Sequence, residues 1–93
     1  MSKKNKNPAS FKIFDGDIDK ETESKFISHS ALAVDTEAMG LIHGRDRLCL
    51  VQICDDLDNV VCIRIGREHK SAPNLKSLLE KKTIQKVFHF ARF

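Results

Sequence analysis

The chain has 93 residues and a formal net charge of +3, with 41% hydrophobic and 31% charged residues. This composition is typical of one small soluble domain, and it excludes a disordered chain. It also excludes a membrane protein, because no apolar run approaches the roughly 20 residues of a membrane-spanning helix. The three cysteines lack C-x-x-C spacing and lie within or beside apolar runs, which favours buried thiols in a reducing compartment and a cytoplasmic location.

The first part of the chain is basic and is not followed by the apolar stretch of a secretory signal. We therefore expect a disordered basic tail over residues 1–10 and a folded domain over residues 11–93. Residues 11–14 alternate between apolar and polar and predict a short first strand that ends in a turn. Residues 19–30 predict an amphipathic helix with Phe26 and Ile27 directed inward.

Three aspartates at alternating positions, Asp15, Asp17 and Asp19, resemble the start of an EF-hand calcium loop. The rest of that pattern is absent, because Lys20 stands at the position of the turn glycine and Phe26 at that of the bidentate glutamate. We therefore favour a turn followed by a helix N-cap over a calcium site.

Residues 31–41 contain an apolar run that leads into two acids, Asp35 and Glu37, and then into a glycine. Successive side chains of a strand point to opposite faces, so Asp35 and Glu37 share one face with two alanines. We expect both carboxylates at the C-terminal end of a strand, on a face that the alanines leave open. Side chains at this spacing can lean together onto a pair of metal ions.

Two further β-rich runs follow. Residues 48–54 are apolar on both faces except for Gln52, as expected for a central strand, and residues 60–65 form the next run. Short links, including a first hairpin loop over residues 42–47, predict an antiparallel meander of three strands.

The last part of the chain predicts a helix and a strand. Residues 71–82 have leucines at helical spacing, Pro73 in the first turn, and Lys81 and Lys82 in the last turn, where they would complement the helix dipole. Residues 85–90 return to strand character, and a strand after a crossover helix most often lies parallel to a strand already in the sheet.

This order of elements is that of an α/β, ribonuclease H-like mixed sheet. Residues 34–41, 48–53 and 86–93 resemble the opening of ribonuclease D-like 3′–5′ exonucleases of the DEDD superfamily. The first motif of that family is D-x-E, and the second runs V-x-H-x-x-x-x-D. The chain contains the second motif except for its aspartate, which would follow Phe93. We therefore expect a truncated or split-gene product that holds the N-terminal part of an exonuclease domain.

The resemblance implies that Asp35 and Glu37 are catalytic and bind two divalent cations, Mg²⁺ or Mn²⁺. In the family these ions activate the attacking water and stabilise the in-line displacement, and hard carboxylate oxygens suit both metals. The alternative interpretation is that the two acids are solvated residues at a strand end.

The resemblance also implies contacts with the 3′-terminal nucleotide from Met39, Gly40 and Leu41, and a phosphate or orienting contact from His89. An apolar wedge can stack on any base without reading the sequence. Met39 and Leu41 are equally consistent with core residues, and Gly40 with a turn. A histidine inside a β run is more often a hydrogen-bonded core residue.

The function implied is metal-dependent hydrolysis of phosphodiester bonds at the 3′ ends of RNA or single-stranded DNA. The chain holds two of the four family carboxylates, so we expect it to be inactive alone. One alternative is a non-catalytic α/β interaction module. Another is one half of a split enzyme that a separately encoded C-terminal half completes.

Overall fold

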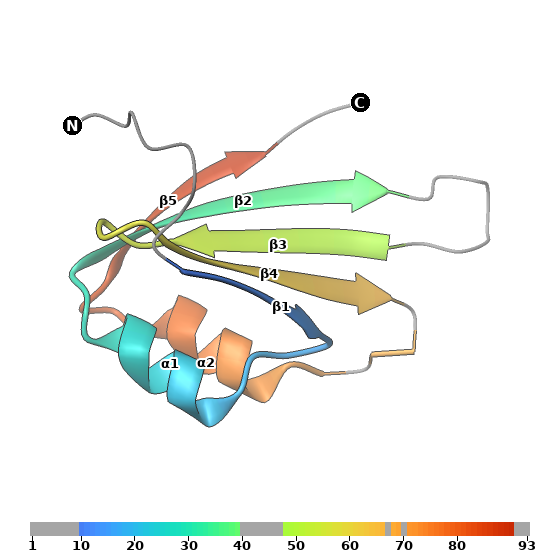
Figure 1. The fold of residues 1–93 in the computed structure, drawn as a ribbon, viewed down its shortest axis with the longest axis horizontal. Helices are drawn as coiled ribbons and strands as arrows, with labels where there is room; N and C mark the ends of the chain where they lie inside the picture. Colours follow the sequence, from blue (N-terminus) through green and yellow to red (C-terminus); the bar gives the residue numbers. More distant parts are fainter. Residues whose placement is uncertain (1–9, 40–47, 67, 70, 91–93) are drawn as a thin grey trace.

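A computed structural model describes residues 10–39, 48–66, 68–69 and 71–90 as one mixed sheet with two helices (Figure 1). The tail over residues 1–9 and the expected loop over residues 42–47 lie outside the described residues. No described helix is long and apolar enough to cross a membrane. The elements in chain order are β1 (Ser10–Asp15), α1 (Lys20–Ile27), β2 (Ala31–Met39), β3 (Leu48–Cys54), β4 (Asn59–Gly66), α2 (Pro73–Glu80) and β5 (Gln85–Phe90).

The five strands follow the order β1-β4-β3-β2-β5. Strands β2, β3 and β4 form the predicted antiparallel meander. Strand β5 follows α2 and lies parallel to β2, which confirms the prediction for a strand after a crossover helix. Strand β1 lies parallel to β4, a pairing that the sequence did not specify. Strand β2 therefore has a neighbour on each side, one antiparallel and one parallel.

The hydrophobic core lies between the sheet and the two helices, which cover the same face (Figure 1). Alternate residues of each meander strand point to this face, as the pleat of a strand requires. Phe26 of α1 is buried and Ile27 packs partly against the core, as predicted. The other core residues from the meander and α2 are Leu32, Val34, Val51, Ile53, Val61, Ile63, Leu75 and Leu78.

The opposite face of the sheet, called the uncovered face below, carries Ala31, Ala33, Asp35 and Glu37 of β2 and their register partners on the other strands. Several large apolar side chains are exposed there, and Phe11, Ile13 and Val87 are each more than half exposed. Neither described helix lies on this side of the sheet. The side chains of this face therefore border open space in the described part of the chain.

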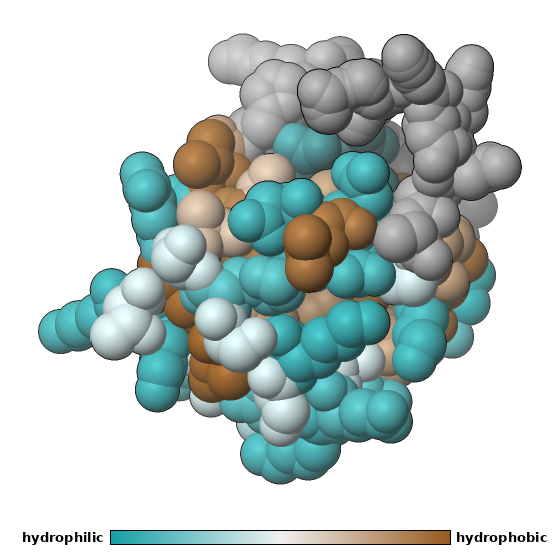
Figure 2. Space-filling model, turned by 60° about the vertical axis from the view of Figure 1, so that its left-hand side comes forward, coloured by the Kyte–Doolittle hydropathy of each residue, from teal (hydrophilic) through white to brown (hydrophobic). Residues whose placement is uncertain are grey.

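At the end of the sheet where the β3–β4 hairpin turns, the surface is mainly hydrophilic, with apolar residues scattered in it (Figure 2). Leu57 in the hairpin is 63% exposed. It lies three residues after Cys54, the last residue of β3, in a turn that is rich in aspartate.

Each of the three alternating aspartates near the N-terminus has a separate structural role. The Asp15 carboxylate accepts two hydrogen bonds from the Arg64 guanidinium, at 2.7 and 2.9 Å. Asp19 is the N-cap of α1 and accepts from the Thr22 backbone N–H at 2.8 Å. This confirms the predicted helix N-cap.

Asp17 caps the other helix from a distance in sequence. The N-cap residue of α2, Ala72, has no side chain that can accept a hydrogen bond. The Asp17 carboxylate accepts instead from the backbone N–H groups of Asn74 and Leu75, at 3.0 and 2.8 Å. These two groups are among the four that a helix N-terminus leaves without partners. The loop before α1 is thereby attached to the start of α2.

Both helices are shorter than the sequence predicts. Helix α1 ends at Ile27, where the His29 N–H bonds back to the Phe26 carbonyl at 3.2 Å and the chain turns into β2. Helix α2 ends at Glu80, so the prediction that Lys81 and Lys82 occupy its last turn was wrong. Lys81 has extended backbone because the chain turns there to bury Ile84 in the core.

Candidate functional site

Strand β2 holds the two predicted acids on the uncovered face. Leu32 and Val34 are 2% and 1% exposed against the helices, so the pleat directs Asp35 and Glu37 to the other side. Both acids are partly exposed. The strand continues to Met39, so the acids lie in its middle and second half and not at its very end. The described parallel pairing between β2 and β5 ends at Thr36. Asp35 immediately precedes this residue and Glu37 immediately follows it.

The strand register brings distant residues beside Asp35. Gln52 on β3 is its antiparallel partner, and His89 on β5 is its parallel partner. Gln52 is exposed, and residues paired in this way share one face of a sheet. The side chain of His89 is outside the description, although its backbone position adjoins Asp35. The contact proposed for His89 stays a prediction.

The structure describes only one of the other predicted nucleotide-binding residues, and of that one only the backbone. Met39 is the last residue of β2 and pairs with Leu48, but its side chain is not described. Gly40 and Leu41 lie outside the described residues. Their contacts with a nucleotide stay predictions.

Charged and polar groups extend the site across the uncovered face. Four paired residues form one line across the strands: Glu37 on β2, Leu50 on β3, Arg64 on β4 and Asp15 on β1. Hydrogen bonds from Arg64 lower the pKa of the Asp15 carboxyl below its ordinary value. Burial raises the pKa of the Cys62 thiol. The charge of Arg64 acts against this rise, and the charge of Glu37 adds to it. The region around Glu37 thus combines a carboxylate with a neutral thiol and an ion-paired arginine.

A second group of possible metal ligands lies where the β3–β4 hairpin meets the segment that follows α1. Within the described ranges, His29, Asp55 and Asp56 offer ligand atoms that lie within 4.8 Å of one another. His29 Nε2 is 3.0 Å from Asp55 Oδ2, and His29 Nδ1 is 3.5 Å from Asp56 Oδ1. We call these three residues the His29 cluster. The sequence alone did not predict this cluster, because only the fold brings His29 to the hairpin.

The His29 cluster is organised by hydrogen bonds within the protein. The Asp55 side chain is fully buried, and its Oδ1 accepts from the backbone N–H groups of Leu57 and Asn59. Its Oδ2 accepts from Asn59 Nδ2 at 2.9 Å and faces His29. The two ring nitrogens of His29 face different acids, so a single cation cannot bind both nitrogens. We interpret the cluster as a structural link between the segment after α1 and the β3–β4 hairpin.

The carboxyl of Asp55 is held in its charged form by this network. Burial by itself raises its pKa, but hydrogen bonds from Asn59 and Leu57 outweigh burial and lower the pKa below 3.8. A signal for the turn was present in the sequence, since aspartate often accepts from backbone N–H groups that follow it in a hairpin.

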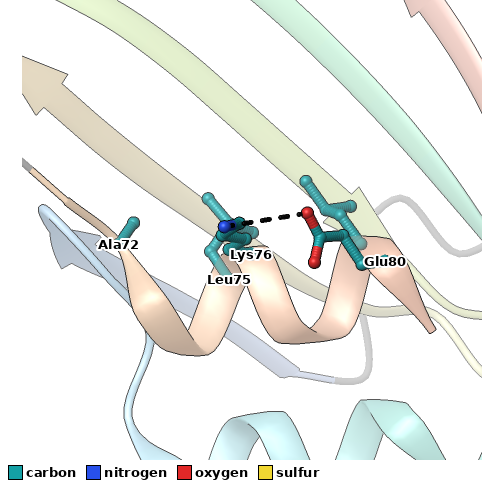
Figure 3. Close-up of a pocket in the computed structure, with 5 residues that line it drawn as sticks. Ala72, Leu75, Lys76 and Glu80 are labelled. Carbon is teal, nitrogen blue, oxygen red and sulfur yellow. Dashed lines mark ion pairs between the residues drawn. The ribbon is translucent and has the colours of Figure 1, made fainter.

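A shallow hollow runs along α2 and is lined by Ala72, Leu75, Lys76, Leu79 and Glu80 (Figure 3). Lys76 Nζ and Glu80 Oε2 point toward one another across it at 3.9 Å. Helix α2 covers the opposite face of the sheet from Asp35. The hollow holds neither of the predicted acids, so it is not part of the candidate site.

Comparisons with known proteins agree on one family. Residues 12–93 match a family model described as a 3′–5′ exonuclease. A solved structure described as the apo form of the nuclease has a TM-score of 0.70 and 40% sequence identity, and the match covers 87% of this chain. NrnC of Brucella melitensis, in a structure bound to pGG, has a TM-score of 0.67 and 36% identity over 86% of this chain. A structure of NrnC with bound Mg²⁺ gives the same values.

These matches confirm the predicted ribonuclease H-like α/β fold and the resemblance to the DEDD exonucleases. In each case the match covers 38% of the solved nuclease, so this chain spans well under half of their length. No curated protein matches the chain significantly.

The His29 cluster predicts a stability effect. Replacement Asp55→Ala removes the acceptor for buried N–H groups, and we expect the free energy of unfolding to fall by about 2–3 kcal/mol in chemical denaturation. The matched control is Asp56→Ala. The Asp56 side chain is 80% exposed, so this change should cost about 0.5 kcal/mol or less.

The pH dependence follows from the direction of the Asp55 pKa. The folded pKa lies below the ordinary value of 3.8, so the stabilisation is fully present above that value and is lost as the pH falls through the folded pKa. Asp55→Asn should therefore show a weaker loss of stability below about pH 4 than the wild type. An identical pH profile would contradict this assignment.

Proposed function

The chain belongs to the 3′–5′ exonuclease family, and we propose that it supplies the first two carboxylates of a metal-dependent site that hydrolyses phosphodiester bonds at the 3′ ends of RNA or single-stranded DNA. In this proposal Asp35 and Glu37 are catalytic and bind the metal. The observation that carries it is that both acids share the uncovered face of β2 within a sheet that matches nuclease structures.

The chain's own residues suit such a site. The carboxylate oxygens of Asp35 and Glu37 are hard donors, which suit Mg²⁺ or Mn²⁺ better than zinc. Two negative charges on neighbouring same-face positions concentrate cations, and partial burial weakens the screening of these charges by water. Hydrogen-bonded strands on both sides of β2 fix the backbone that carries the acids. When bound, two such ions would supply Lewis acidity and lower the pKa of the attacking water.

The substrate and the further contacts are also part of the proposal. The pGG-bound state of NrnC supports a nucleic-acid 3′ end as the ligand, and its Mg²⁺-bound state supports magnesium. We propose that Met39, Gly40 and Leu41 contact the terminal nucleotide. The register position of His89 beside Asp35 supports a role for it near the scissile phosphate.

We further propose that the 93-residue chain has no nuclease activity alone. The chain contains two of the four carboxylates of a DEDD site, and its match covers 38% of the related nucleases. A cytoplasmic location is proposed as well, supported by the three cysteines, none of which forms a disulfide.

The activity prediction is tested with end-labelled single-stranded RNA and single-stranded DNA, Mn²⁺ and the purified chain. We expect no stepwise shortening from the 3′ end, because the remaining metal ligands are absent from the sequence. Stepwise shortening that Asp35→Ala abolishes would contradict the proposed inactivity while supporting the proposed site.

Metal binding by the two acids is tested by thermal unfolding. At a Mn²⁺ concentration ten times the dissociation constant, binding to the folded state adds about 1.4 kcal/mol. For a domain of this size that raises Tm by roughly 5–10 °C. We expect this rise in the wild type and in Asp56→Ala, but not in Asp35→Ala.

The competing hypothesis is a non-catalytic α/β interaction module. It predicts that Mn²⁺ leaves the Tm of the wild type unchanged. A rise in Tm that persists in Asp35→Ala but disappears in Asp56→Ala would instead assign metal binding to the His29 cluster.

A further inference from the structure

Strand β3 has one polar residue in an otherwise apolar run. Gln52 stands among leucine, valine, isoleucine and cysteine residues in β3 (Leu48–Cys54). Its neighbours Val51 and Ile53 are buried against the helices, so Gln52 points to the uncovered face and is exposed. The core has no need for an amide at this position, and an exposed β position accepts many residues.

The register places this amide directly opposite a proposed metal ligand. Gln52 pairs with Asp35 across the antiparallel β2–β3 ladder. Directly opposed side chains have Cβ atoms about 4.5–5.5 Å apart, within reach of a glutamine amide. The partners on either side of Gln52 along this face of β3 are Leu50, opposite Glu37, and Cys54, opposite Ala33. Gln52 is therefore the one amide that β3 presents to the two acids.

The neighbour on the other side favours one orientation of the amide. Gln52 pairs with Cys62 on β4, whose thiol is a weak hydrogen-bond donor. A glutamine side chain has an acceptor oxygen and a donor nitrogen. In the proposal, a donor at Cys62 and an acceptor carboxylate at Asp35 together favour the amide oxygen toward β4 and the amide nitrogen toward β2.

We propose that Gln52 is a positioning residue for Asp35 when a divalent cation is bound: its side-chain amide N–H then donates to one carboxylate oxygen of Asp35 while the cation binds the carboxylate. This inference rests on the proposed metal site. Groups that orient metal ligands in this way typically contribute 10–100-fold to metal affinity.

The test measures Mn²⁺ affinity of the purified chain by electron paramagnetic resonance of the free ion. We expect Gln52→Leu to weaken binding about tenfold or more. The matched control is Gln85→Leu. Gln85 is also an exposed glutamine on the uncovered face, but it pairs with Ala31, four residues or about 13 Å along β2 from Asp35. This control should bind Mn²⁺ within twofold of the wild type.

A spectroscopic readout separates positioning from a general effect on folding. The side-chain ¹⁵N–¹H signals of Gln52 should shift on addition of diamagnetic Mg²⁺ in the wild type but not in Asp35→Ala. Metal-free thermal unfolding of Gln52→Leu should match that of Gln85→Leu, because both glutamines are exposed.

The outcomes distinguish the two proposals. Equal Mn²⁺ affinity in the wild type and Gln52→Leu, with binding lost in Asp35→Ala, would overturn the role of Gln52 and leave the metal site standing. Absence of binding in the wild type, or undiminished binding in Asp35→Ala, would overturn the metal site and this inference with it.

Discussion

The alternation of side chains along β2 is the constraint on which the site depends. Leu32 and Val34 are buried by the helices, and a one-residue shift of the strand would expose them and bury the acids between sheet and helices. The cost of losing two core residues and desolvating two carboxylates fixes Asp35 and Glu37 on the uncovered face. The position of the site is therefore a consequence of the core on the opposite face.

Buried and partly buried acids elsewhere hold the scaffold together and must be distinguished from the candidate ligands. Asp17 attaches the loop before α1 to the start of α2, and Asp55 joins the β3–β4 hairpin to His29. Their oxygens accept hydrogen bonds from protein N–H groups, which is the chemistry of caps and turns. Asp35 and Glu37 lie beside one another on a face that no described helix covers, where a cation and a phosphate could approach.

The sequence predicted the features that local patterns determine. Strand alternation placed Asp35 and Glu37 on one face, and the order of elements predicted the meander and the parallel final strand. The helix ends were wrong because tertiary packing, such as the burial of Ile84, decides where α2 stops. The bond between Asp17 and Leu75 spans 58 residues, so no local pattern contains it. The place of Gln52 beside Asp35 likewise required the register.

Paramagnetic broadening by Mn²⁺ in ¹⁵N–¹H spectra of the labelled chain tests whether Asp35 and Glu37 form the proposed metal site. We expect sub-stoichiometric Mn²⁺ first to broaden the backbone amides around Asp35 and Glu37, together with the cross-strand amide of Gln52. Broadening centred on His29 and Asp55, or spread evenly over the exposed acids, would contradict it.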